Sequence, residues 1–191
     1  MNEDGSFNLL VGATDLGTGS DTILAQIAAE VLTVPLEKII VYSSDTDLTP
    51  FDVGAYASST TYVSGNAVRL AAEKVKEKVL DLAAVYFEKD RSELTLESAE
   101  VRSRDGSSVS LSELCTMHMY TFNQQQISES ASYVGEESPP PFAASFAEVE
   151  IDTDTGKITL VNFVSYADCG LALNPVQAKG QLEGGSMQGI G

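Results

Sequence analysis

The 191-residue sequence has no tryptophan, one histidine and two cysteines, and it is poor in basic residues. A single histidine excludes a histidine-rich metal site. Cys115 and Cys169 match no zinc or redox spacing, so two packed thiols are expected. The sequence also lacks an apolar run of about 18 residues, which excludes an apolar transmembrane helix. Residues 1–5 are acidic, unlike a secretory signal, and a cytoplasmic location is expected.

The charge balance is strongly acidic. Lys and Arg number 11 against 28 Asp and Glu, which gives a formal net charge of −17. A surface of this charge repels nucleic acid and anionic lipid unless basic side chains form a stripe. The only lysine cluster, at residues 74–78, alternates with glutamates. Nucleic acid and membranes are therefore not expected as partners, whereas the 43% of hydrophobic residues suffices for a folded core.

Hydrophobic periodicity predicts an α+β fold, with mixed β-sheets, two main helices and a C-terminal helix that is truncated. The loop at 44–64 is long for a compact domain, and such loops are usually functional or disordered. The chain stops inside the last helix, as a piece of a longer polypeptide would. The predicted elements are a strand at 7–11, a helix at 21–33, a strand at 38–43, a helix at 66–87, a hairpin at 92–110, a short helix at 111–119, a candidate strand at 127–134, a hairpin of 145–151 and 157–165, and a helix from Pro175.

Two loops are rich in hydrogen-bond donors. Gly17, Thr18 and Gly19 lie between a predicted strand and helix, where unpaired N–H groups and the helix dipole favour an anion. The common nucleotide motifs do not fit this loop, because a required glycine is Thr22 and a required lysine is Thr18. The Ser58–Thr61 run offers hydroxyl and N–H donors. Anion binding and simple turn formation both stay open for these loops.

Other polar groups favour structural interpretations. The Asp152–Gly156 stretch departs from the calcium-loop pattern and is predicted to be a turn. Asp45, Asp47 and Asp52 are interpreted as solvated loop residues, although a hard cation is an alternative. His118 lacks a recognisable nucleophile partner and is interpreted as a partly buried polar residue. The residues alone therefore offer no catalytic constellation and no metal site.

The chain contains a series of ordered sequence blocks, at residues 12–22, 25–30, 45–50, 54–62, 65–68, 168–170, 174–175, 180–181 and 184–191. Together these blocks resemble the large subunit of the molybdenum hydroxylases, the xanthine dehydrogenase and aldehyde oxidase family. The likeness covers nearly the whole chain and is loose only over about 88–140. The family loop usually reads Gly-Gln-Gly, where this chain has Thr18, and bacterial members often carry an arginine where this chain has Ser59.

This resemblance implies that the chain binds molybdopterin, the molybdenum cofactor, through three loops. The family's catalytic glutamate, in a downstream Gly-Glu-Pro-Pro context, lies beyond residue 191, so no catalytic residue and no metal ligand are assigned. The implied cofactor-binding residues are Gly17, Thr18, Gly19, Ala57, Ser58, Ser59, Thr60 and Gln181.

The resemblance also implies the setting of the chain. Residues 1–191 are interpreted as a fragment of a molybdopterin-binding domain, with a sub-boundary near 88–140. The parent enzyme would oxidise a purine, another N-heterocycle or an aldehyde with water-derived oxygen. Iron–sulfur clusters and FAD are expected on partner domains or subunits, and the fragment is expected to be inactive alone. The alternative is a non-catalytic binding or assembly module whose glycine loops are purely structural.

Overall fold

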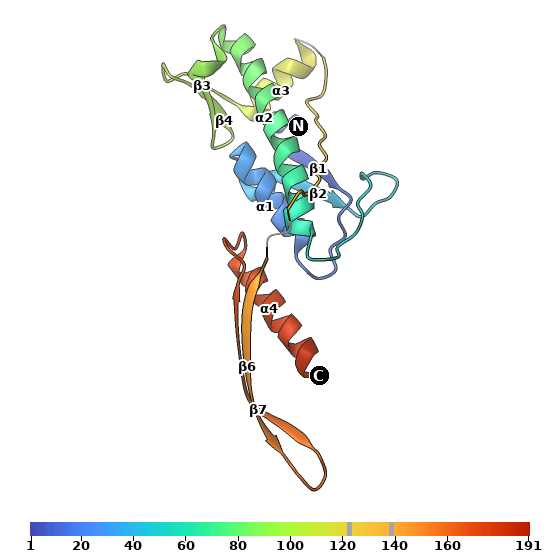
Figure 1. Ribbon diagram of the computed structural model, residues 1–191. Helices are drawn as coiled ribbons and strands as arrows, with labels where there is room; N and C mark the ends of the chain where they lie inside the picture. Colours follow the sequence, from blue (N-terminus) through green and yellow to red (C-terminus); the bar gives the residue numbers. More distant parts are fainter. Residues whose placement is uncertain (122–123, 138–139) are drawn as a thin grey trace. The chain divides into compact units, whose positions relative to one another are not determined.

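The computed structural model describes residues 1–121, 124–137 and 140–191 (Figure 1). The chain forms two compact units, Met1–Gly135 and Glu136–Gly191, and each is described by itself. Helices and small sheets occur in both units, which confirms the predicted α+β fold.

The first unit begins with a β-α-β motif. β1 (Phe7–Val11) is followed by α1 (Ser20–Leu32), the short 3₁₀ turn η1 (Leu36–Lys38) and β2 (Ile39–Ser43). The two strands pair in parallel, from Phe7 opposite Ile39 to Val11 opposite Ser43. α1 buries one face, including the fully buried Leu24, and these apolar side chains join the core of the unit. The predicted strands and helix are confirmed to within one residue at their first positions.

α2 (Thr60–Phe87) is the longest helix of the described residues and begins six residues before the predicted start at 66. The prediction was wrong here because hydroxyl and β-branched residues such as Thr60, Thr61 and Val63 have weak helix propensity. Tertiary packing outweighs that weak preference: α2 packs along α1, and Val68, Ala72, Val79 and Ala83 are buried. The preceding loop is therefore shorter than predicted and spans 44–59.

Beyond α2 lie the 3₁₀ turn η2 (Arg91–Glu93) and a small antiparallel sheet of β3 (Leu94–Glu97), β4 (Glu100–Ser103) and β5 (Ser108–Ser110). The sequence predicted a single hairpin, and the β3–β4 turn was missed. That turn places Ser98 and Ala99 at positive φ, at 51° and 62°, without the glycine that usually marks such a turn. α3 (Leu111–Tyr120) follows, and the Ser110 Oγ accepts a bond from the Glu113 N–H at 3.2 Å, as the capping-box spacing predicts.

The segment after α3 is not the candidate strand at 127–134, because the structure assigns no strand there. It lies along α2 instead, held by side chains in place of a backbone ladder. The Lys78 and Lys74 ammonium groups donate to the carbonyls of Ser128 and Ser130, at 3.3 and 2.9 Å, and Ile127 is buried. The predicted polar and proline-rich stretch extends over 122–123 and 138–139, which lie outside the described residues.

The second unit contains β6 (Phe142–Ile151), β7 (Ile158–Asp168) and α4 (Pro175–Ile190). The strands form the predicted antiparallel hairpin, with a register shift between Glu148 and Val149. The Asp152 carboxylate accepts bonds from the N–H groups of Asp154 and Thr155, at 2.9 and 3.2 Å, which confirms the predicted turn. α4 begins at Pro175 as predicted, and the Asn174 side chain caps it through the Gln177 N–H at 3.1 Å.

Candidate functional site

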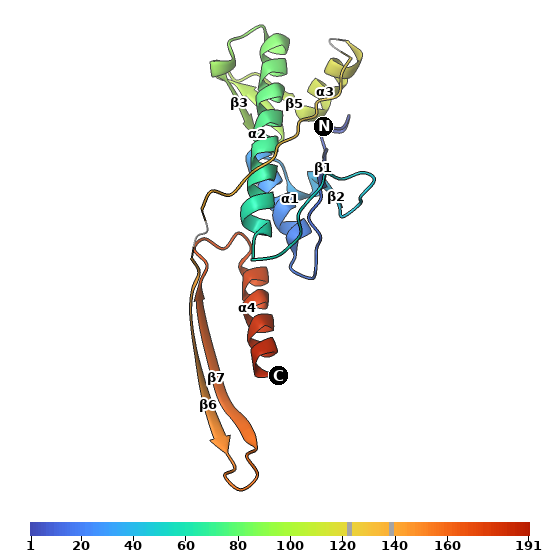
Figure 2. The same cartoon turned by 45° about the vertical axis from the view of Figure 1, so that its right-hand side comes forward.

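Two of the predicted donor loops leave the same edge of the first unit. β1 and β2 are parallel, so their carboxyl ends lie at one edge of the sheet. The loop at 12–19 leads from the end of β1 to α1, and the loop at 44–59 leads from the end of β2 to α2 (Figures 1 and 2). Open sheets with parallel strands commonly bind ligands beyond this edge. This arrangement makes the edge the candidate site.

The backbone of the first loop is organised by Asp15, which the sequence interpretation did not single out. Its Oδ1 accepts the N–H groups of Gly17 and Gly19, at 2.8 and 3.1 Å, and its Oδ2 accepts the Asp21 N–H at 3.4 Å. Burial raises the pKa of Asp15, but the bonds from Gly19, Gly17, Asp21 and Thr18 together outweigh it and lower the pKa below its usual value. Two of the N–H groups predicted to hold an anion are therefore already paired with a carboxylate.

A second feature of this region is its polar side-chain atoms, which lie at the end of the loop and at the start of α1. Within the described residues, the hydroxyl oxygens of Thr18 and Ser20 are buried without a hydrogen-bond partner, and so is Oδ1 of Asp21. The other Asp21 oxygen accepts a bond from the Ser43 hydroxyl at 3.0 Å, which ties the start of α1 to the end of β2. Buried polar atoms are normally paired, so these orphaned groups indicate a place where a ligand contributes the missing partners.

The second loop holds two successive non-glycine residues at positive φ. Ala57 has φ 52° and Ser58 has φ 56°. Such strained backbone is unusual and concentrates at functional sites. In the part of the chain that the structure describes, the N–H groups of Ala57 and Ser58 have no partner, whereas the N–H and hydroxyl of Ser59 both donate to the Tyr56 carbonyl, at 3.1 and 2.8 Å. Thr60 begins α2, so this loop places free donors at a helix N-terminus.

The two loops are held together by close contacts. A Cβ added at Gly12 would lie 2.1 Å from the Pro50 carbonyl oxygen, so the chain segments meet there without room for a side chain. Asp52 fixes the next part of the loop, because it accepts the Ser64 hydroxyl at 2.9 Å and the Gly54 N–H at 2.8 Å. The loop preceding Ala57 is thereby anchored to the first turns of α2.

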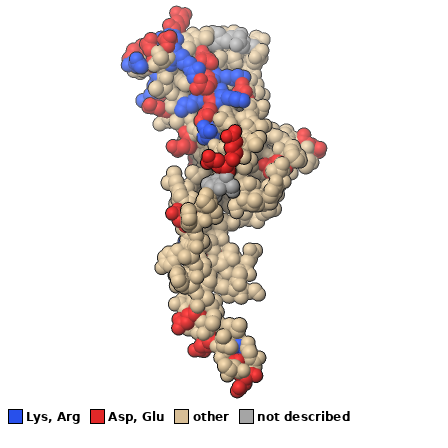
Figure 3. All heavy atoms as spheres, in the orientation of Figure 1, with Lys and Arg blue, Asp and Glu red and all other residues tan. Residues whose placement is uncertain are grey.

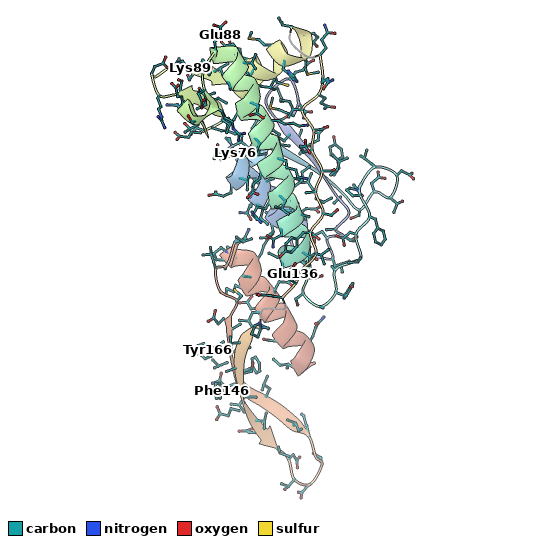
Figure 4. All side chains as sticks on the ribbon, turned by 45° about the horizontal axis from the view of Figure 1, so that its top comes forward. Lys76, Glu88, Lys89, Glu136, Phe146 and Tyr166 are labelled. Atoms are coloured by element: carbon teal, nitrogen blue, oxygen red, sulfur yellow. The ribbon has the colours of Figure 1, made fainter. Side chains whose placement is uncertain are left out.

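Gln181 belongs to the second unit, so its relation to the other two loops is not described. It is exposed on α4 and lines a groove of about 590 Å³ between α4 and the β6–β7 hairpin. Small side chains of the hairpin, among them Ala143 and Ser145, face glycines of α4 across this groove. The register places Phe146 and Tyr166 together on the opposite face of the hairpin, where both are about two-thirds exposed (Figure 4).

The other polar and titratable residues considered in the sequence have contacts or burial of a structural kind. His118 is buried in α3, and burial lowers its pKa. Asp45 accepts the N–H groups of Asp47 and Leu48, a turn-forming role. Both cysteines are free thiols, with Cys115 buried and Cys169 exposed. Among the described residues, no group of three or more His, Cys, Asp or Glu side chains is arranged to hold a metal ion.

The surface of the first unit carries mixed charge. Figure 3 shows Lys and Arg gathered over α2 and the β3–β5 sheet, with Asp and Glu side chains among them. Several are paired, including Arg69 with Glu73 and Lys78 with Glu129. None of the helices in the described ranges has the length and hydropathy of a bilayer-spanning segment.

Comparison with known proteins supports one family. The model of the molybdopterin cofactor-binding domain matches residues 1–191. The chain is 38% identical over 191 residues to the probable hypoxanthine oxidase XdhD of Escherichia coli, covering all of this chain and 20% of that protein. It is also 30% identical to the carbon monoxide dehydrogenase large chain of Afipia carboxidovorans, over 95% of this chain and 23% of the relative.

Solved structures agree. The CO dehydrogenase from Oligotropha carboxidovorans superposes with a TM-score of 0.84 at 29% identity, over 97% of this chain and 24% of the other. Quinoline 2-oxidoreductase from Pseudomonas putida gives a TM-score of 0.81 at 27% identity, over 96% of this chain and 24% of the other. The chain thus spans between a fifth and a quarter of the length of these relatives. Since the family model covers every residue of it, the chain belongs to the molybdopterin cofactor-binding domain family.

Proposed function

We propose that this chain is the molybdopterin-binding segment of a molybdenum-dependent hydroxylase related to the xanthine and carbon monoxide dehydrogenases. The observation that carries the proposal is the pair of donor loops, 12–19 and 44–59, at one edge of the β1–β2 sheet. In the full-length protein the substrate would be a purine, another N-heterocycle or an aldehyde. Iron–sulfur and FAD domains or subunits would be its partners, and the cytoplasm its location.

The second loop fits the phosphate of molybdopterin. Ala57 and Ser58 present unpaired N–H groups next to the N-terminus of α2, where the helix dipole favours negative charge. No arginine or lysine is required for such a site, so the net charge of −17 is no objection. The hydroxyls of Ser58 and Thr60 add further donors. We assign Ala57, Ser58, Ser59 and Thr60 to the phosphate-bearing part of the cofactor.

The first loop fits the cofactor through its side chains. The orphaned hydroxyls of Thr18 and Ser20 require partners, and an uncharged heterocycle rich in nitrogen and oxygen offers them. Gly17 and Gly19 allow the backbone to turn beside the ligand, with φ of 87° and 76°. Gln181 would contribute an amide from the second unit. When bound, the molybdenum centre supplies the oxidation–reduction chemistry, and these residues bind and orient the group that carries it.

The test uses a protein extended in both directions and expressed in a host that makes molybdopterin. Oxidation of the denatured protein is expected to release a fluorescent pterin, and elemental analysis is expected to find molybdenum. The 191-residue chain alone is expected to show no hydroxylase activity. Repeated absence of both pterin and molybdenum from the extended protein would refute the proposal in favour of a non-catalytic assembly module.

A further inference from the structure

We propose that Asp15 is a positioning residue that occupies the N–H groups of Gly17 and Gly19, so that the loop at 12–19 excludes phosphate and the hydroxyls of Thr18 and Ser20 contact the ligand. The inference about the bound ligand rests on the proposed function. The inference about phosphate concerns this chain alone and is tested separately.

The carboxylate of Asp15 accepts the backbone N–H bonds that a bound anion would otherwise accept at the start of α1. Asp15 lies two, four and six residues before the three N–H groups it accepts, those of Gly17, Gly19 and Asp21. Both carboxylate oxygens are used, and Gly19 is the N-cap of α1. These are the unpaired donors and the positive helix end that would otherwise attract a phosphate. The carboxylate therefore takes the position that the sequence interpretation left open for a phosphate.

The surrounding charge adds to this exclusion. Asp21 lies in the first turn of α1, beside Asp15, and its carboxylate is bonded to the Ser43 hydroxyl. The lowered pKa of Asp15 means that the group is ionised at neutral pH. A phosphate approaching this loop would meet two carboxylates and no unpaired N–H from Gly17 or Gly19. The second loop has the opposite character, with free N–H groups at Ala57 and Ser58.

Among the described residues, Asp15 leaves two hydroxyls unpaired, beside Oδ1 of Asp21. Oγ1 of Thr18 and Oγ of Ser20 are buried and unpartnered, and Ser20 is only 5% exposed. A hydroxyl both donates and accepts, so it suits the mixed donors and acceptors of an uncharged heterocycle. Asp15 fixes the loop that contains Thr18 and leads into Ser20, the first residue of α1, so Asp15 is a positioning residue and not a ligand-binding one.

Amide NMR of the 191-residue chain tests the exclusion of phosphate. Inorganic phosphate and acetate are titrated against wild type and Asp15→Ala, and the Gly17 and Gly19 amide signals are followed. Wild type is expected to show no saturable shift at these glycines. Asp15→Ala empties the loop of its carboxylate, so both amides are expected to shift saturably as the added anion replaces it. Asp45→Ala is the matched control, because Asp45 organises a similar turn in the other loop.

The proposal would be overturned if the Gly17 and Gly19 amide signals of wild type shifted saturably with phosphate. It would also be overturned if these signals did not respond to either anion in a folded Asp15→Ala variant. If the Asp15→Ala variant does not fold, amide hydrogen exchange is measured on Asp15→Asn instead. It keeps the side-chain shape but loses the charge, and amide exchange at Gly17 and Gly19 is expected to be several-fold faster than in wild type; unchanged exchange would contradict the role of the carboxylate. Pterin release from the extended protein tests the proposed function independently of these signals.

Discussion

Gly19 is the residue on which the geometry of the first loop depends. Its φ of 76° and ψ of 24° are left-handed, a conformation that costs an ordinary residue about 1–2 kcal/mol and a β-branched residue more. Its N–H also bonds to Asp15. A change of backbone conformation at Gly19 therefore alters both the start of α1 and the positions of the neighbouring hydroxyls.

Gly19→Val is expected to abolish cofactor loading in the extended protein, because valine resists left-handed backbone and its side chain blocks close approach of the ligand. Pterin released per mole of protein measures the effect. Gly19→Asn is the control, since asparagine tolerates this conformation, and it is expected to retain most of the loading. Normal loading by the valine variant would place the cofactor elsewhere.

Asp105 gives a pH-dependent contribution to stability. The bond from Lys89 is the main cause of its lowered pKa, and the Ser107 hydroxyl and N–H add to it. Because the pKa is lower in the folded chain, the stabilisation is present above the unfolded value of about 3.9 and is lost as the pH falls below it. Asp105 is exposed to solvent and Lys89 is only partly buried, so the effect is small.

Asp105→Asn is accordingly expected to reduce the loss of unfolding free energy between pH 6 and pH 3. Urea denaturation at several pH values measures this difference, with Lys89→Met as a second variant that removes the same bond. An identical pH dependence in wild type and both variants would contradict the assignment.

Sequence reasoning at this scale found the loops but not how their donors are used. Glycines and small hydroxyl residues mark the turns at 17–19 and 57–60, because few other residues suit such backbone. The fold-back of Asp15 was missed, although an aspartate two residues before a glycine is a known signal for side-chain to backbone bonding. The roles of Asp21 with Ser43 and of Asp52 with Ser64 require tertiary contacts that no local pattern contains.

At the scale of elements, the contact between loops 12–19 and 44–59 depends on Gly12. The space for its Cβ is taken by backbone and side-chain atoms of Pro50 and Asp52, and the nearest is a carbonyl oxygen that cannot swing aside as a side chain does. The alanine side chain can be accommodated only if the 44–59 loop moves away from the end of β1.

Gly12→Ala is therefore expected to lower the unfolding free energy by about 1–3 kcal/mol, the usual cost of overpacking. Thermal or urea unfolding measures it. Gly180→Ala is the matched control: it lies in α4 with no atom within 4 Å of the added Cβ, so no destabilisation is expected. Equal stability of wild type and the Gly12 variant would show that the loops do not need this contact.

The elements themselves followed from periodicity wherever the apolar pattern was strong. α1 and the β6–β7 hairpin were predicted from apolar spacing next to a turn sequence, and the start of α4 from Pro175, which suits the first turn of a helix. The start of α2 and the β3–β4 turn were missed because local preference there is weak and packing decides. The segment after α3 is fixed by lysines of α2, a long-range interaction that its own residues do not reveal.

At the scale of the whole molecule, the second unit leaves a large apolar surface exposed. Phe146 and Tyr166 lie together on one face of the hairpin, and Leu171 and Val176 are 90% and 82% exposed. Large apolar side chains grouped on one exposed face, as Phe146 and Tyr166 are, mark surfaces that associate. The relatives are four to five times longer than this chain, which fits a unit that is normally covered.

The isolated chain is therefore expected to self-associate through this face. The double variant Phe146→Thr with Tyr166→Thr is expected to raise the monomer fraction in size-exclusion chromatography and to bind less of a hydrophobic dye. Phe51→Thr is the control, because Phe51 is 90% exposed but belongs to a loop of the first unit and not to the hairpin. Unchanged association in the double variant would exclude this face as the cause.

The short β-α-β motif also bears on the order of assembly. Paired residues of β1 and β2 are separated by 32 positions, as in Phe7 and Ile39, and the described contacts between the two donor loops, of Gly12 with Pro50 and Asp52, also lie early in the chain. Chains generally fold from the N-terminus during synthesis. Both donor loops can therefore be synthesised and in contact with each other before the second unit, Glu136–Gly191, has been synthesised.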